Sequence, residues 1–278
     1  MTITSVVARG AAALFAGAND DDGAFLGDST SAPAAGNADG ASPIRLYGLK
    51  TLPSNVPEPA RLQIAADDDP SFAIFTLPSE SPNGTFTLAE QSVAFENLVT
   101  GTVEQALGSL NGFAQQPSVP TEQNIMLFGH QQALDRDRNR AWRTLILPSL
   151  TVAPLGNNME TGAETPFSYS FSLNKYTRLP WGATLTDGLH GATRAGAFQI
   201  NAEHPVHIKR YTGNNSVATF NLDFTPIDVS HTIVFVDNVQ ATVNSVSTVN
   251  KTFTLASAPG SSAKVVVVYG FDATELGA

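Results

Sequence analysis

The sequence has no cysteine among its 278 residues, and only 14% of them are charged. The first absence excludes disulfides and thiolate metal sites, so packing, backbone pairing or oligomerisation must stabilise the fold. This charged content is low for a soluble monomer, and 42% of the residues are apolar. No apolar run approaches the roughly 20 residues that span a bilayer, so we expect no membrane insertion. The amino end has one early charge, Arg9, and a short apolar stretch broken by Gly17, which predicts no signal peptide.

The net charge of −10 is unevenly distributed. Residues 1–135 carry 15 acids and 4 bases, residues 136–212 carry 5 acids and 9 bases, and the remainder carries 5 and 2. Opposite fields steer association, so an acidic first half and a basic middle suit head-to-tail pairing of identical chains. Solvated surface is the alternative explanation of each run. The acidic balance argues against a tightly bound nucleic acid, because affinity for phosphate depends on Lys and Arg.

Short alternating segments separated by Gly, Pro, Asn and Asp predict an all-β fold. The clearest is FSYSFSL, residues 167–173, where aromatic and apolar side chains face one way and three serines face the other. That period of two fits a half-buried strand. FNLDF, residues 220–224, repeats it. Further strands are expected at Thr85–Leu88, Thr144–Leu147, Ala197–Ile200, Ile233–Val236, Thr252–Leu255 and Lys264–Tyr269.

One short helix is expected in addition to the strands. Thr102 can cap it, Gln105 takes the capping-box position, and one face would carry Val103, Ala106, Leu107 and Leu110. This spacing is typical of an amphipathic helix. Such a helix would cover one face of a sheet.

Three regions follow from composition: an amino-terminal arm and long loop over 1–43, a body over 44–212 and a module over 213–278. Ala16–Pro43 is rich in Ala, Gly, Asp and Ser and has almost no periodic apolar pattern. It cannot bury enough surface to fold alone, so we expect it to be disordered or ordered against a partner. TGNNS, which begins at Thr212, separates the body from the module, and we expect the module to need no contact with the body.

The sequence offers little chemistry. His204 and His207 lie three apart, but Pro205 bars a helix interior and a strand sends the two rings to opposite faces, so a metal site is not expected. The acidic runs Asp20–Asp22 and Asp67–Asp69 are contiguous, whereas a calcium loop alternates its ligands. Neither a phosphate loop nor a G-x-S-x-G elbow is present. We therefore expect no enzyme and no cofactor.

The run DRDRNR combines arginines with acids that would neutralise a phosphate clamp, so an intersubunit salt-bridge ladder or an exposed loop is expected. Trp142 and Trp181 are expected to be core or interface anchors, because no basic stripe surrounds them. The candidate subunit-interface residues are Arg136, Arg138, Arg140, Arg143, Asp20, Asp21, Asp22, Asp67, Asp68, Asp69 and Trp142.

Residues 219–271 resemble a module that is frequent in bacteriophage tail and fibre proteins. The likeness rests on the first strand TFNLDF, the hairpin VFVDN, the strand TFTL, the turn APGSSA and the final strand VVVVY. The hairpin glycine of that module is Asn238 here. Because Asn also tolerates positive φ, we expect the turn after Asp237 to survive.

The segments IRLYGLKTLPSNVPEP, PNGTFTLAEQSVAFENLVTG, NRAWRTLILPSLTVAPLG and ETPFSYSFSLNKYTRLPWG, within residues 44–182, resemble in order and spacing the major tail tube proteins of long-tailed phages. The likeness implies a tail-tube-type β-sandwich or barrel body with a flanking helix, an arm and a long loop. The carboxyl-terminal module would be a small immunoglobulin-like β-sandwich that decorates it. Such subunits form hexameric rings that stack into a tube for genome passage.

The resemblance also implies partners: copies of the chain itself, the tape measure, tail terminator and distal tail proteins, and double-stranded DNA in transit without tight binding. The chain would be made in the host cytoplasm and end in the virion tail. An acidic lumen would repel phosphate and so would not arrest the DNA. Two alternatives stay open: a cement or fibre protein of the phage head, and a carbohydrate-binding or hydrolytic adhesin, for which Trp181 near Asp187 is the only candidate pair.

Overall fold

The computed structural model describes residues 7–20, 25–49, 61–66, 69–76, 83–101, 103–107, 110–114, 124–135, 137–155, 167–173, 179–181, 186–187, 191–192 and 198–276. Strands dominate these residues, with one short α-helix, α1 (Val93–Thr100), and one 3₁₀ helix, η1 (Ala273–Leu276). The all-β expectation is confirmed. Within these residues neither helix is long and apolar enough to cross a membrane.

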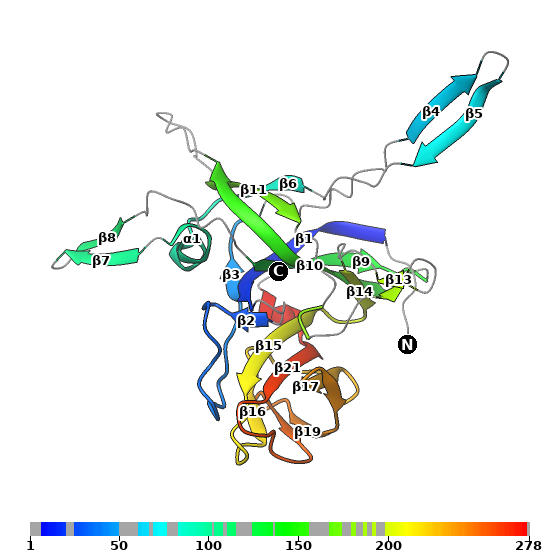
Figure 1. Cartoon of the computed structure of the whole chain (residues 1–278). Coiled ribbons are helices and arrows are strands. Elements are labelled where there is room, and N and C mark those ends of the chain that lie inside the picture. Colours follow the sequence, from blue (N-terminus) through cyan, green and yellow to red (C-terminus); the bar gives the residue numbers. More distant parts are fainter. Residues whose placement is uncertain are drawn as a thin grey trace.

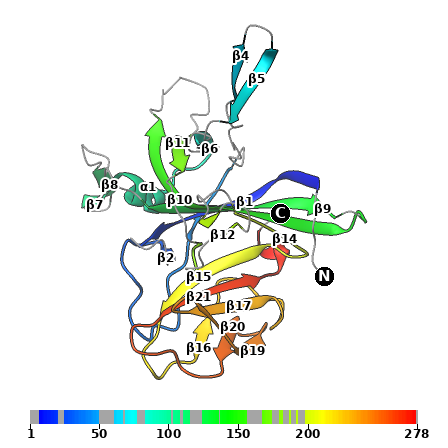
Figure 2. The same ribbon diagram turned by 45° about the vertical axis from the view of Figure 1, so that its right-hand side comes forward.

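An antiparallel sheet of eight strands forms the body (Figures 1 and 2). Strands β3 and β14 pair with β1 and β10 beside the main path, and the expected strand at 167–173 is β11. The path runs through β2 (Phe25–Gly27), β1 (Val7–Asn19), β9 (Ile125–Leu134), β10 (Arg140–Leu155), β11 (Phe167–Leu173) and β6 (Asn83–Leu88), with β3 at Ile44–Leu46 and β14 at Phe198–Ala202.

Strand β1 divides its side chains between two hydrophobic cores. Phe15 stacks on its cross-strand partner Phe128 with ring centroids 5.2 Å apart, and both belong to the core on the side of the carboxyl-terminal module. The neighbouring Leu14 and Ala16 belong to a second core on the other side, together with Phe86 and residues of α1. Successive side chains of a strand point to opposite faces, so the body sheet is apolar on both.

The expectation of a helix from Thr102 is wrong. Strands β7 (Val103–Leu107) and β8 (Leu110–Ala114) pair there as a hairpin. The Gly-Ser pair between them suits a two-residue hairpin turn, and this signal outweighs the helical spacing of the apolar residues. The real helix, α1, comes just before: Ser92 caps it by accepting from the Phe95 backbone N–H at 3.4 Å, and Gly101 ends it at φ 70°.

Three further hairpins pair only within themselves among the described residues: β4 (Arg61–Ala66) with β5 (Asp69–Thr76), β7 with β8, and β12 (Thr186–Asp187) with β13 (Gly191–Ala192). In both views the β4–β5 hairpin stands far from the body sheet, and β7–β8 stands to the side of α1 (Figures 1 and 2). Neither adds a strand to a larger sheet.

The carboxyl-terminal module consists of two small sheets. One has the order β15-β21-β17-β18 and the other β16-β20-β19. The continuous run of Val265 to Tyr269 lies in β21 and is buried on both faces. The strands are β15 (Val206–Thr212), β21 (Lys264–Gly270), β17 (Thr232–Val236) and β18 (Val239–Ala241), then β16 (Thr219–Asn221), β20 (Thr252–Leu255) and β19 (Val243–Ser247). Below, "the module" means residues 206–276.

Asp237 and Asn238 form the turn between β17 and β18, with φ values of 48° and 70°. Asparagine thus takes the left-handed conformation that the sequence required of it, and this expectation is confirmed. The sequence predicted the amino-terminal boundary of the module less well. All seven residues of β15 pair with β21, so the module's sheet begins at Val206, before the expected boundary at 213.

The body and the module share one hydrophobic core. A single cluster of buried side chains contains Phe15, Phe128 and Trp142 from the body together with Val267 and Tyr269 from the module. The expectation that the module needs no contact with the body is therefore wrong. TGNNS misled because a turn-rich stretch can lie inside a unit: Gly213 is itself hydrogen-bonded to Ala263 and Ser262 of the module.

Candidate functional site

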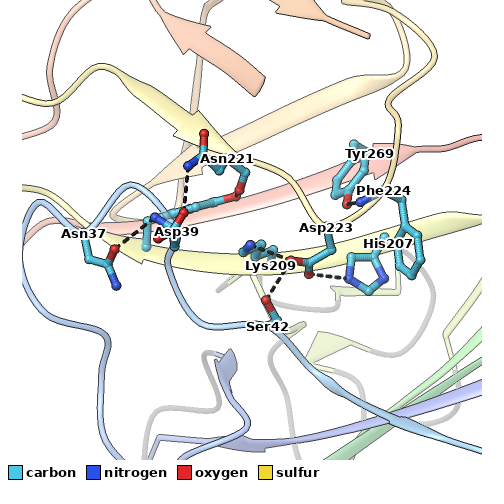
Figure 3. Close-up of polar contacts among 10 residues, drawn as sticks. Asn37, Asp39, Ser42, His207, Lys209, Asn221, Asp223, Phe224 and Tyr269 are labelled. Atoms are coloured by element: carbon cyan, nitrogen blue, oxygen red, sulfur yellow. Dashed lines mark hydrogen bonds and ion pairs between the residues drawn. The ribbon is translucent and has the colours of Figure 1, made fainter. Parts of the chain in front are cut away.

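The best-built polar site lies where residues 35–42, here called the arm segment, cross the open side of the module. Ala35 and Ala41 bridge to Thr212 and Arg210 on the edge of β15. The Asn221 backbone N–H, on β16, donates to the Ala38 carbonyl at 2.8 Å. The arm segment therefore closes the gap between the edge strands of both module sheets (Figure 3).

This placement differs from the expectation that Ala16–Pro43 is disordered or ordered against a partner. Its first residues extend β1 as far as Asn19, where Leu14–Ala18 are buried by β9. Its last residues are ordered by the chain's own module. Gly36 and Gly40 adopt φ values of 76° and 62°, which favour glycine, and a Cβ on Gly40 would collide with the Tyr211 ring.

At the end of the arm segment, the carboxylate of Asp223 accepts three hydrogen bonds (Figure 3). Nζ of Lys209 donates to Oδ1 at 2.6 Å, Oγ of Ser42 donates to Oδ1 at 2.8 Å, and Nε2 of His207 lies 3.1 Å from Oδ2. Lys209 and His207 are two positions apart on β15, so their side chains lie on the same face of that strand. One carboxylate thus joins the arm, β15 and the segment after β16.

The electrostatics of this network keep Asp223 ionised. Burial acts to raise the pKa of the carboxyl group, but the bonds and charges of His207 and Lys209 more than offset it and hold the pKa well below its usual range. Burial lowers the pKa of His207, and the nearby Asp223 only partly reverses this. The side chain of Lys209 is 4% exposed, so its charge depends on Asp223 for compensation.

Aromatic rings surround His207 and connect the polar network to the shared core. Its ring centroid lies 4.8 Å from that of Phe224, 5.1 Å from Phe15 and 5.6 Å from Tyr269. The hydroxyl of Tyr269 accepts from the Phe224 backbone N–H at 3.1 Å. Residues of β1, β15 and β21 therefore meet at one point, beside the carboxylate that anchors the arm segment.

A second buried histidine, His130 on β9, lies within ring contact of Phe15 and Phe271, at 5.5 and 5.6 Å. Its Nδ1 is 3.1 Å from the hydroxyl of Thr144, which also accepts from the Val206 backbone N–H at 3.3 Å. Burial is the main cause that lowers the pKa of His130, and the charge of Arg45 adds to it. This bond network links the body sheet to the first residue of β15.

Two further ionic contacts tie the module to the amino-terminal half. Oδ2 of Asp20, just after β1, lies 2.9 Å from Nζ of Lys264 and 3.6 Å from Nη1 of Arg210. Nη1 of Arg210 also donates to the Phe25 carbonyl at 2.9 Å. On the other side, the Arg45 guanidinium donates to the Leu276 carbonyl in η1. The module is therefore held to the body by charge as well as by the core.

This arrangement is suited to holding segments together. Ser42 donates to Asp223 and not to His207, so the three residues do not form a serine–histidine–carboxylate relay. His204 pairs edge-on with His231, at 5.4 Å between centroids, and not with His207. Across the described part of the chain, no group of three or more His, Asp and Glu residues could hold a metal ion.

The structure separates the arginines that the sequence grouped. Arg138 and Arg140 are exposed at the end of the β9–β10 hairpin, where Asp135 accepts from the Asn139 backbone N–H at 2.7 Å. Arg143 is half-buried on β10, opposite Gln131 and Asn201. Among the described arginines of this set, Arg138 and Arg140 are the exposed ones.

Of the other expected interface residues, Trp142 is 2% exposed and lies in the shared core, which is the first of the two roles expected for it. Asp20 forms its ion pairs inside the chain. Asp69 begins β5. The described residues do not include Arg136, Asp21, Asp22, Asp67, Asp68 or the side chain of Asp69.

Sequence reasoning missed Asp223, Lys209 and Ser42 and considered His207 only as a metal ligand. One signal was available: VHIKRYT places three charged or titratable residues within a strand-like run, and FNLDF places Asp223 among aromatic residues. Buried charges need partners, but the sequence could not say that these two segments meet. No family model matches the chain, and no curated protein matches it.

Proposed function

We propose that the chain is a structural protein of a phage virion that assembles through its hairpins into stacked rings, forming the tail tube. In this proposal the body sheet is the tube-type β-sandwich and the module is an immunoglobulin-like decoration. The rings are hexameric, and the role is structural and not catalytic. The partners are other copies of the chain, the tape measure, tail terminator and distal tail proteins, and DNA in transit.

The observation that carries the proposal is that β4–β5 and β7–β8 pair, among the described residues, only within themselves and away from the body sheet. An isolated two-stranded hairpin is at best marginally stable in water, and its outer edges leave backbone groups unpaired. Another copy of the chain would supply the missing surface. A heterologous contact of this kind repeats around a ring and between rings.

Two further features support the proposal. Residues 1–135 contain 15 of the 25 acids, and an acidic wall repels the phosphates of DNA that passes through it. Arg138 and Arg140 stand exposed at the end of a long hairpin, where they can reach acids of a neighbouring subunit. The sequence likeness in residues 44–182 and 219–271 points to the same class of virion protein.

Electron microscopy of the purified chain tests the proposal directly. We expect the chain alone to form hollow rods of uniform width. In a matched variant, residues 61–76 are replaced by a short Gly-Ser linker. Since β4 and β5 pair with no other strand of the described part of the chain, this variant should stay folded, with an unchanged near-ultraviolet circular dichroism spectrum, and remain monomeric.

Other results would replace the proposal. If the chain formed no rods but bound to purified phage heads, it would be a head cement or fibre protein. Binding or turnover of glycans by a chain that stays monomeric would favour the adhesin. If the variant that lacks 61–76 assembled as well as the parent, the hairpin would not be the assembly element.

A further inference from the structure

The module has two open sides, and the described residues cover only one of them. On the first side the arm segment hydrogen-bonds to the edges of β15 and β16. On the second side, β18 leads through Thr242 directly into β19, so their outer edges form one continuous edge over residues 239–247. Among the described residues, the backbone bonds of these strands run only inward, to β17, to β20 and to Ala256.

This edge lacks the charged residues and prolines that commonly protect an edge strand, and its remaining protection is the short length of β18 and the register shift in β19. Natural edge strands carry lysine, proline or inward-pointing charges that prevent another strand from adding to them. Residues 238–250, NVQATVNSVSTVN, contain no charged residue and no proline, and six of the thirteen are valine or threonine. Val239 is 70% exposed and Val249 is 89% exposed. The edge is therefore uncharged and, among the described residues, open to another strand, with exposed Val239 at its start and exposed Val249 in the turn that follows it.

We propose that residues 239–247 pair in antiparallel fashion with the same residues of a second copy of this chain. A two-fold contact sets Val239 of one copy opposite Ser247 of the other, so charges of one sign on this edge would lie close to charges of the same sign. Like charges opposite one another destabilise a strand pair. In a chain with a net charge of −10, an uncharged edge is the surface on which two copies can meet without repulsion.

The contact is small and needs many copies to become strong. A single pair of short edge strands buries less surface than a stable dimer interface does, so two free chains bind weakly. Copies that are already held close together by another surface pair through this edge at high effective concentration. The edge thus acts as a lateral contact between modules. It does not depend on whether the body forms rings.

Charge substitutions on the edge test the pairing in the full-length chain. Gln240 and Asn244 are exposed, and Asn244 lies at the register shift in β19. One variant carries Gln240→Lys with Asn244→Lys, and its counterpart carries Gln240→Glu with Asn244→Glu. Ser257→Lys with Ser261→Lys, at exposed positions away from the edge, is the control for added charge.

The measurement is amide hydrogen exchange of the peptide that covers residues 238–250, followed as the protein concentration rises. We expect protection that grows with concentration in the parent and in the control. The association constant should fall roughly tenfold in each single-sign variant, because side chains of like charge then lie close together across the strand pair. An equimolar mixture of the Lys and Glu variants should restore the protection.

The mixture makes the test specific, since a misfolded edge would not recover when two variants are combined. Exchange that is independent of concentration in the parent would overturn the proposal. The edge would then not pair with a second copy, and a different protein would be its partner. Equal protection in the parent and in both single-sign variants would overturn it too, because the protected surface would then lie elsewhere.

Discussion

Nζ of Lys209 lies 2.6 Å from Oδ1 of Asp223, and this ion pair joins β15 to the segment that follows β16. The lysine is almost fully buried, while the carboxylate is 23% exposed. Ser42 and His207 bond to the same carboxylate, so Asp223 is the residue on which arm, module and core converge. Removing its charge leaves a buried ammonium group without compensation.

Asp223→Asn should lower the free energy of unfolding by roughly 3 to 5 kcal/mol, the cost of breaking a buried pair. Urea unfolding at pH 7 measures this. Asp137→Asn removes the same charge from an exposed hairpin end and should change the stability by less than about 0.5 kcal/mol. Adding Lys209→Met to Asp223→Asn should recover much of the loss. No recovery would mean that the damage comes from the lost Ser42 and His207 bonds.

Acid should weaken the junction between body and module. The pKa values of His130 and His207 are lowered from 6.5 by burial, so the unfolded chain binds more protons than the folded chain below that pH. Their contribution to stability is complete above pH 6.5 and is lost as the pH falls toward the lowered values. Each histidine contributes a slope of up to about 1.4 kcal/mol per pH unit.

Urea unfolding between pH 7.5 and 5.5 isolates this effect, because carboxyl groups titrate mainly at lower pH. His130→Gln should reduce the slope by up to about 1.4 kcal/mol per pH unit, the contribution of one bound proton. An equal slope in the parent and in His130→Gln would show that His130 is not buried in its neutral form.

The sequence predicted the strands well wherever a local pattern decides the structure. Thr252–Leu255 is β20 as expected, and residues 167–173 are β11, because side chains of period two favour a strand. The same period in residues 220–224 was not sufficient, since β16 ends at Asn221. The expected helix from Thr102 failed because apolar residues at mixed spacing fit both periods. There the two-residue turn carried the information.

The junction could not be predicted in the same way. The arm segment, from Ala35 to Ser42, is held mainly by backbone bonds to residues about 170 to 180 positions later, and such bonds leave little trace in the sequence. Gly40 was a usable sign, since its backbone conformation excludes most side chains. The partner of Lys209 depends on how two sheets face each other, which composition and periodicity do not specify.

Gly40→Ala should detach the arm segment from the module. A Cβ at this position meets the Tyr211 ring and the Arg210 carbonyl, and φ is 62°, so the substitution combines a clash with backbone strain. Limited proteolysis should then cleave within residues 28–42 faster than in the parent. Gly260→Ala is the matched control, because its nearest neighbour would be 3.9 Å from the new Cβ. Equal cleavage in both variants would contradict the role of Gly40 in holding the arm segment against the module.

Charge reversal at the end of the β9–β10 hairpin tests how the subunits meet. If Arg138 and Arg140 dock on acids of a neighbouring copy, Arg138→Glu with Arg140→Glu should slow assembly, since opposite fields steer association. Arg136→Glu can be added as a third change. Exposed pairs contribute roughly 0.2 to 1 kcal/mol each, so the expected effect is a longer lag in light scattering and not the dissolution of formed rods.

Salt should reproduce the effect of the reversal. The Debye length falls from about 10 Å at 0.1 M to about 3 Å at 1 M salt. The difference in assembly rate between the parent and the variant should therefore shrink as the ionic strength rises. Lys251→Glu, on a half-exposed lysine that pairs with Glu275 inside the module, is the control for a charge reversal away from the hairpin. A doubly reversed chain that assembles at the parental rate in low salt would place these arginines on solvated surface and exclude them from the subunit contact.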